Sequence, residues 1–208
     1  MIAHAMTIIV NELNHQLTEA YGMSGEHAPA GLRMLNSGPS SPATGAESAT
    51  QECLNLTLVN IQEDAALRIS PVAPSHSGSA YQTPPLPLNL HVLLTATHAS
   101  YTQALLMLGR AMQFFHAQAL FTEVNVRRES LTQYAPAHAL DRLREFKIAF
   151  DLYSPSLQET QQVWSSLGSP AVPAALYKLR LLTFATDAPD TKVLPMLERR
   201  LPSKPDQN

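Results

Sequence analysis

The sequence predicts an α+β fold in which helices pack on one face of a mixed, mostly antiparallel sheet. Four segments alternate apolar and polar residues with the period of two that is typical of strands. Three other segments repeat apolar residues at helical spacing. The two kinds of segment do not alternate regularly along the chain, which favours α+β over α/β architecture.

The composition is that of a globular chain with few charges. Charged residues make up 15% of the 208 positions, and the net charge is −3. Soluble domains usually carry about 25% charged residues. A subunit that covers much of its surface with neighbours would have such a composition, and so would a low-charge monomer. Mild acidity and the lack of a basic-aromatic platform argue against nucleic acid as a partner.

The most apolar stretch, Pro84–Phe121, predicts a strand followed by a long helix that together supply the core. The expected strand face comprises Leu86, Leu88, Leu90, Val92 and Leu94. The expected buried helix face comprises Tyr101, Leu105, Leu108, Met112 and Phe115. Gly109 falls inside this helix, where glycine costs about 1 kcal/mol relative to alanine. We therefore expect another backbone to pack closely against it.

Residues 2–21 form a predicted amphipathic helix that Gly22 ends. Its polar face has no lysine or arginine, which favours packing on the sheet over binding at a membrane surface. No apolar run approaches the ~20 residues that a membrane span needs, so we expect no membrane insertion. The N-terminus lacks the basic leader of a signal peptide, and we expect the chain to fold in the cytoplasm.

The predicted domain covers residues 1–188, and residues 189–208 are expected to form a C-terminal tail or arm. Residues 24–52 are rich in Gly, Pro, Ser, Ala and Thr, which predicts a mobile loop. Leu32, Met34 and Leu35 within it could form a brief strand. A second polar loop is expected at residues 71–83.

The remaining elements follow from alternation and capping signals. Strands are predicted at Cys53–Ile61, Phe146–Tyr153 and Leu176–Thr186, and a short helix at Pro136–Arg144. A further helix is expected to begin at Ser156, because a serine followed three residues later by glutamate forms a capping box. Gly168 and Pro170 are expected to end it.

Trp164 and Cys53 are each present once as their residue type. Trp164 is expected to anchor the capped helix to the sheet, with a role at an interface as the alternative. Cys53 permits no internal disulfide and is expected to be a small buried residue, not a nucleophile.

No motif for catalysis, nucleotide binding or metal binding is present. The eight histidines form no HExxH pair and no Cys/His cluster, and no GxSxG elbow or phosphate-binding glycine loop occurs. We therefore expect no cofactor, no metal and no enzymatic activity. The alternative is a small α+β ligand-binding domain or enzyme with a site at the mouth of the sheet. For that site His91, His98 and Glu123 are the only candidates.

Three segments together resemble a known family: Leu54–Arg68, Pro84–Phe121 and Ser154–Phe184. The resemblance is to the N-terminal domain of the tail-terminator, or cap, proteins of phage-tail-like contractile injection particles. Its motifs are packing motifs and contain no catalytic signature. The matching residues are Pro85, Leu86, Leu88, Leu90, Leu93, Leu94, Thr95, Ala96, Leu108, Gly109, Ala111, Met112, Phe115, Trp164, Leu167, Gly168, Pro170, Leu176 and Tyr177.

The sequence departs from this family at three places. Asn60 with Ile61 replaces an aromatic-rich strand end, His91 lies near a usual aromatic, and Ala171–Val172 replaces an aromatic-basic pair. These changes put contacts with neighbouring subunits in question and leave the expected fold intact.

The resemblance implies a tail-terminator-like fold and a structural role. It implies a homo-hexameric ring that ends polymerisation of the inner tube protein and anchors the last layer of the tail sheath protein. It also implies cytoplasmic assembly within a particle that is later released or associated with a membrane.

Overall fold

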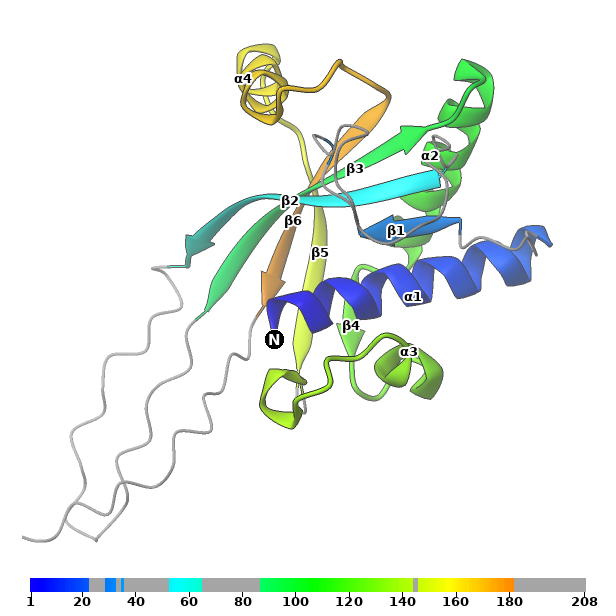
Figure 1. Cartoon of the computed structure of the whole chain (residues 1–208), viewed down its shortest axis with the longest axis vertical. Helices are drawn as coiled ribbons and strands as arrows, with labels where there is room; N and C mark the ends of the chain where they lie inside the picture. The colour runs from blue at the N-terminus through cyan, green and yellow to red at the C-terminus, as the bar shows by residue number, and fades with distance from the viewer. Residues whose placement is uncertain (23–28, 33–34, 36–52, 65–86, 144–145, 182–208) are drawn as a thin grey trace, which may run out of the picture.

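The computed structural model describes residues 1–22, 29–32, 35, 53–64, 87–143 and 146–181. Four α-helices and six strands are formed within these ranges (Figure 1). The helices are α1 (Ile2–Tyr21), α2 (Tyr101–Ala117), α3 (Arg128–Thr132) and α4 (Leu157–Leu167), with a 3-10 turn at Ala139–Asp141. The strands are β1 (Ala30–Leu32), β2 (Cys53–Glu63), β3 (Leu88–Thr97), β4 (Leu120–Thr122), β5 (Lys147–Tyr153) and β6 (Ala174–Leu181).

The six strands form one sheet in the order β1-β2-β3-β6-β5-β4. Only β1 and β2 are parallel, and every other neighbouring pair is antiparallel. The predicted class, α+β with a mixed and mostly antiparallel sheet, is therefore confirmed. The strand from the most apolar stretch, β3, lies between β2 and β6, and seven of its ten residues fall within the predicted strand from Leu86 to Leu94.

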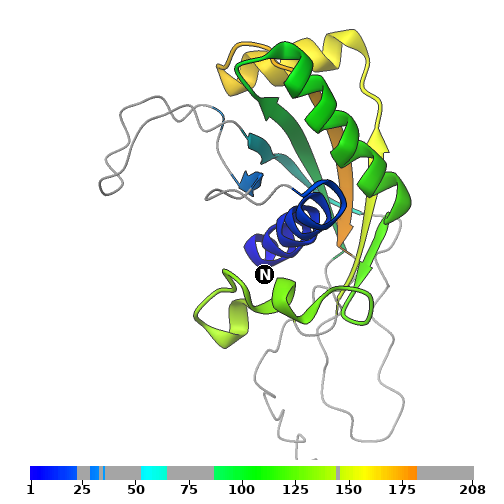
Figure 2. The same cartoon turned by 90° about the vertical axis from the view of Figure 1, so that its right-hand side faces the viewer.

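The sheet curls around α1 and α2, which pack on the same face, called here the inner face (Figure 2). Alternation places Leu56, Leu94 and Phe150 on this face, and all three are fully buried. Helix α1 contributes Ile9, Leu13 and other apolar residues at the predicted spacing. Its end is also as predicted, since Gly22 adopts the left-handed conformation with φ of 63°.

Aromatic rings from four elements form the centre of the core. Phe115 of α2 packs at 4.2 Å from Phe150 of β5 and at 5.3 Å from Tyr177 of β6, measured between ring centroids. Phe121 of β4 completes the group at 6.5 Å from Phe115. Burial raises the pKa of Tyr177 to about 12, so its phenol stays neutral within the core.

The buried face of α2 differs from the predicted one. Phe115 and Leu108 are buried as expected, whereas Tyr101 is 68% exposed and Leu105 is 46% exposed. The helix is rotated so that the small residues Ala104 and Ala111 face the core, which lets the helix axis approach the sheet. The prediction followed the spacing of the large apolar residues, and these residues lie at the edge of the contact between α2 and the sheet.

The close backbone packing predicted at Gly109 is wrong. A Cβ atom built there meets no heavy atom within 4 Å, so no other described segment packs closely against this glycine.

The segment from β4 to Leu143 is bound to α1 by buried polar groups. The amide Nδ2 of Asn11 donates to the carbonyl oxygens of Ser130 (3.1 Å) and Gln133 (2.9 Å). A carboxylate oxygen of Glu12 accepts from the backbone N–H of Arg127 at 2.9 Å. This segment, which the sequence left mostly unassigned, contains α3 and the 3-10 turn within the predicted Pro136–Arg144 helix.

Several predictions fall outside the described residues. They are most of the 24–52 loop, the 71–83 loop, the end of the Leu176–Thr186 strand and the boundary at residues 188 and 189. A brief strand was expected at Leu32, Met34 and Leu35; the strand formed is β1 at Ala30–Leu32, so it contains Leu32, whereas Leu35 lies in a turn and Met34 is outside the described residues. Cys53 is buried as predicted, and its Sγ contacts Oδ1 of Asn55 at 3.2 Å. Among the helices of the described ranges, none has the length and hydrophobicity required to cross a membrane.

Candidate functional site

Helix α4 lies beyond one end of the sheet and packs less tightly than the other long helices (Figure 1). Its start is the predicted capping box: the backbone N–H of Ser156 donates to Glu159 Oε2 (2.7 Å), and the N–H of Glu159 donates to Ser156 Oγ (3.3 Å). Gly168 ends the helix with φ of 61°. No residue of α4 is fully buried, so its position depends on partly buried side chains such as Trp164.

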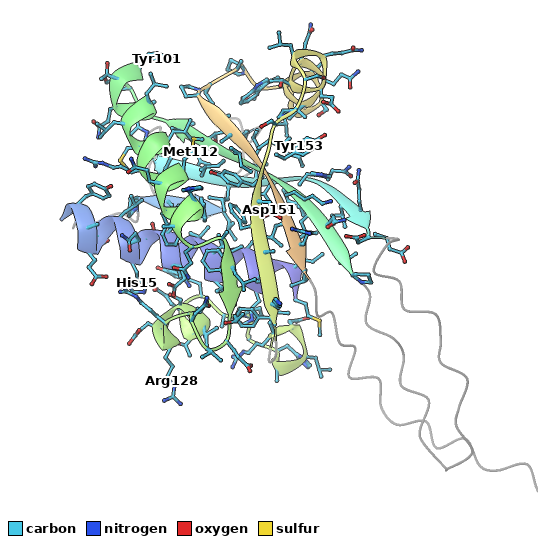
Figure 3. The ribbon with its side chains drawn as sticks, turned by 180° about the vertical axis from the view of Figure 1, so that it is seen from behind. His15, Tyr101, Met112, Arg128, Asp151 and Tyr153 are labelled. Atoms are coloured by element: carbon cyan, nitrogen blue, oxygen red, sulfur yellow. The ribbon has the colours of Figure 1, made fainter. Side chains whose placement is uncertain are left out.

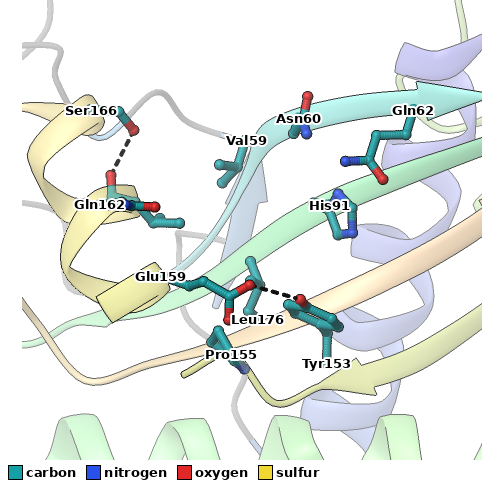
Figure 4. Close-up of a pocket in the computed structure, with 11 residues that line it drawn as sticks. Val59, Asn60, Gln62, His91, Tyr153, Pro155, Glu159, Gln162, Ser166 and Leu176 are labelled. Atoms are coloured by element: carbon teal, nitrogen blue, oxygen red, sulfur yellow. Dashed lines mark hydrogen bonds between the residues drawn. The ribbon is translucent and has the colours of Figure 1, made fainter. Parts of the chain in front are cut away.

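A cavity of about 410 Å³ separates α4 from the outer face of the sheet (Figure 4). Polar side chains from both sides line it: Asn60, Gln62, His91, Tyr153, Glu159, Gln162 and Ser166. The Tyr153 hydroxyl donates to a Glu159 carboxylate oxygen at 3.5 Å. The hydrogen bonds from Ser156 are the main reason that the pKa of Glu159 is lowered, so this carboxylate caps the helix as an anion.

His91 is the titratable group at the floor of this cavity. Its ring packs against Tyr153 with 5.5 Å between centroids. Burial, and to a smaller extent the charge of neighbouring Lys178, lower the pKa of His91. The imidazole is therefore neutral near pH 7 and contributes a polar but uncharged surface.

A second cavity of about 410 Å³ adjoins the first, since both are lined by Tyr153, Pro155, Val163 and Leu176. Thirteen residues line it, and none of them is charged. Met112 of α2, Leu152 of β5 and Trp164 of α4 contribute its apolar walls, while Ser154 and Thr160 contribute hydroxyl groups. We call this cavity the neutral groove.

The strand edges are a further feature of the described sheet. β1 pairs with β2 only from Leu54 to Leu56, and β4 pairs with the first half of β5. Beyond Leu56, β2 has a bulge between Leu58 and Asn60, and Oδ1 of Asn60 accepts the N–H of Ile61 at 2.9 Å. A β-bulge, and a side chain that bonds a free backbone N–H, both limit unspecific pairing of an exposed sheet edge with other strands.

The three residues proposed for a catalytic or ligand-binding site do not converge. His91 lies in the middle of β3, and His98 follows the end of the same strand, roughly 20 Å away at strand spacing. Glu123 follows β4, which is separated from β3 by β6 and β5. Within the described ranges, no group of three or more His, Cys, Asp or Glu side chains could hold a metal ion.

The neutral groove was not predicted from the sequence. Met112 was assigned to the buried face of a helix and Leu152 lies in the predicted strand Phe146–Tyr153, and only the alternative interpretation of Trp164 as an interface residue pointed toward the groove. In the structure Leu152 is 54% exposed, because β4 ends before it reaches this part of β5.

Two solved assemblies share similarity with this chain. One is the PVC sheath/tube terminator of an extracellular contractile injection system in the extended state, with 15% identity and a TM-score of 0.43. The other is the tube-terminating cap of the anti-feeding prophage, with 13% identity and a TM-score of 0.48. The alignments cover 97% and 92% of this chain but only 65% and 60% of those chains. No curated protein matches the sequence.

The family comparison covers nearly the whole chain. The model of the Pvc16 N-terminal domain matches residues 5–198, a range that includes all three segments on which the resemblance to cap proteins was based. That resemblance is therefore confirmed, and the chain belongs to the Pvc16 N-terminal domain family.

Proposed function

We propose that this protein is the structural cap of a contractile injection particle. In this role it forms a homo-hexameric ring on the end of the inner tube, stops addition of tube subunits and anchors the last layer of sheath. The observation that carries the proposal is the family match over residues 5–198. A cap needs stable contacts with neighbours and no chemistry.

The low charge and the incomplete strand edges support this role. Only 15% of the residues are charged, so contact surfaces can be covered with little cost of removing charges from water. Among the described residues, β2 beyond Leu56 pairs only with β3, and β5 beyond Ala149 pairs only with β6, so each has one edge without a neighbouring strand. An extended arm of a sheath subunit can add to such an edge through main-chain hydrogen bonds.

The alternative, a ligand-binding domain or enzyme, is not proposed. Its candidates His91, His98 and Glu123 are distributed over distant parts of the sheet. The cavity under α4 contains His91 and Glu159, but Glu159 is already used to cap its own helix.

Deletion of the gene in cells that produce the particle tests the proposal. Electron microscopy of purified particles measures tube lengths and the presence of sheath at each end. We expect tubes of heterogeneous and greater length, with sheath lost from one end, and restoration by the wild-type gene. Native mass spectrometry of the purified protein should show a complex of six 22.7 kDa chains. Unchanged particles after deletion would refute the cap function.

A further inference from the structure

We propose that the neutral groove receives Tyr134 from the next copy of this chain in the ring. The inference rests on the proposed function, because a closed ring uses two different surfaces of each subunit, and each interface joins one kind of surface to the other. The structure offers a candidate for each: the protruding aromatic residue Tyr134, which is 79% exposed, and the uncharged groove.

Tyr134 is held in a backbone conformation that an aromatic residue seldom adopts. Its φ is +55°, and it is the one residue other than glycine with positive φ in the described part of the chain. The left-handed conformation favours glycine, and asparagine tolerates it better than tyrosine does. Strained positions of this kind are found disproportionately where a protein meets a ligand or partner.

Little of the described part of the chain covers the side chain of Tyr134. It is 79% exposed, although tyrosine usually buries most of its ring when it contributes to stability. Tyrosine is also among the residues that most often dominate the binding energy of interfaces. An exposed tyrosine on a strained backbone is therefore better explained by a contact outside the chain.

The platform beneath Tyr134 is rigid. Asn11 of α1 holds the carbonyl oxygen of Gln133 at 2.9 Å, and the N–H of Ala135 donates to the carbonyl of Thr132 at 3.2 Å. Both neighbours of Tyr134 are thus fixed. A side chain presented from a fixed backbone loses little entropy on binding, which favours association.

The neutral groove matches a tyrosine side chain in chemistry. Its lining contains no charged residue, so no charge would lose its water when the groove is filled. Met112, Leu152 and Trp164 provide apolar contacts for an aromatic ring. A buried phenol needs a hydrogen-bond partner, and the hydroxyl groups of Ser154 and Thr160 lie in the same lining. The volume of about 410 Å³ exceeds that of one aromatic side chain, so adjacent residues can enter with it.

The two surfaces cannot meet within one molecule. α3, which directly precedes Tyr134, lies at one end of the folded domain, and α4 with the groove lies at the other (Figures 1 and 2). Seen from behind, Arg128 of α3 lies at the bottom of the folded domain, and Met112 and Tyr153 lie in its upper half (Figure 3). Copies arranged head to tail would bring one surface against the other at every interface.

The test uses two variants, each of which lacks one of the two surfaces. Tyr134→Gly removes the ring and keeps the groove, and glycine accepts the left-handed backbone, so its midpoint of unfolding in urea should not fall. Leu152→Asp combined with Trp164→Phe keeps Tyr134 but places an unpaired charge in the groove. Because Trp164 is the only tryptophan, the fluorescence of a mixture then reports the groove of the Tyr134→Gly variant alone.

Matched controls change exposed apolar residues outside both surfaces. Val124→Ser alters an exposed side chain of the segment that follows β4, and Leu157→Asp adds a charge to α4 at a position that is 90% exposed and does not line the groove. Both controls should assemble as the wild type does.

We expect the wild-type chain to form rings and its tryptophan emission to move to shorter wavelength as the concentration rises. Each variant alone should remain monomeric in analytical ultracentrifugation. Their mixture should give a two-chain complex with the shifted emission, because one intact surface of each kind is present. A mixture without complex or shift overturns the inference, as does a wild-type chain that stays monomeric at every soluble concentration.

Particle assembly separates the inference from the proposed function. If Tyr134→Gly rescues tube length in the deletion strain as well as the wild type does, the inference is wrong and the cap function stands. If the wild-type gene itself has no effect on tube length, the cap function is wrong. The inference is supported when wild type, Val124→Ser and Leu157→Asp all restore tube length and Tyr134→Gly and Leu152→Asp do not.

Discussion

The backbone N–H of Leu143 donates a 2.8 Å hydrogen bond to Nδ1 of His4, across 139 residues of sequence. The other ring nitrogen, Nε2, therefore carries the proton and donates to the carbonyl oxygen of Leu131 at 3.0 Å. His4 is buried and joins α1 to the segment that carries α3. This segment presents Tyr134, so the histidine supports a surface that we assign to assembly.

Stability should fall as the pH drops below about 6.5. Burial is the main reason that the pKa of His4 is lowered from its ordinary value of 6.5, so the unfolded chain binds the proton more readily than the folded chain. Its contribution is complete above 6.5 and is lost below that pH. Urea unfolding at pH 7.5 and pH 5.5 should show this loss in the wild type, and a smaller one in His4→Gln. Equal pH dependence in both would contradict the role of His4.

Removal of the imidazole should destabilise the protein at neutral pH. His4→Ala leaves the N–H of Leu143 and the carbonyl of Leu131 without this partner, which costs about 1–3 kcal/mol. Amide hydrogen exchange should locate the effect at Leu143. The exposed His116 provides the control, and His116→Ala should leave the free energy of unfolding within about 0.5 kcal/mol of the wild type.

Two residues of α2 should differ strongly in their effect on stability. Phe115→Ala removes a ring that contacts Phe150 and Tyr177 and should cost about 3–5 kcal/mol. Leu105→Ala on the exposed side should cost about 1 kcal/mol or less. Chemical denaturation of both variants measures the difference. Similar losses would mean that α2 is buried on the stripe that periodicity predicted.

The capping box should stabilise α4 locally. Ser156→Ala removes the hydroxyl that accepts from the N–H of Glu159 and should cost about 1 kcal/mol. Because α4 has no fully buried residue, the effect is expected in amide exchange of α4 before it is seen in global unfolding. Ser165→Ala, an exposed change on the same helix, is the control. Unchanged exchange of α4 in Ser156→Ala would disprove the role of the cap.

The ion pair between Asp151 and Arg180 should contribute little. The guanidinium Nε donates to Oδ2 of Asp151 at 3.1 Å, but both side chains are more than two-fifths exposed. Water and salt weaken such pairs, so Asp151→Asn should change the free energy of unfolding by less than about 1 kcal/mol. A loss of more than about 2 kcal/mol in the free energy of unfolding would show that the ion pair is shielded from water in the protein tested.

Local signals predicted the elements that depend on few neighbours. The capping box at Ser156, the left-handed glycines at Gly22 and Gly168 and the alternation around Phe150 each follow from the chemistry of a short segment. These features were correct because backbone sterics and side-chain periodicity decide them almost alone.

Features that depend on distant residues were missed. The rotation of α2 places the small residues Ala104 and Ala111 against the sheet. A scale of side-chain hydrophobicity gives small residues little weight, so it does not predict this rotation. The neutral groove exists because β4 ends opposite Ala149 and leaves Leu152 exposed. The strain at Tyr134 depends on contacts of Gln133 with α1, 122 residues earlier in the chain. None of these has a signature in a local stretch of sequence.

The length distribution of inner tubes in a deletion strain tests the cap function most directly. The proposal predicts long and heterogeneous tubes without this gene and a narrow distribution when the wild-type gene is restored. Tubes of normal, uniform length in the deletion strain would contradict the proposed function.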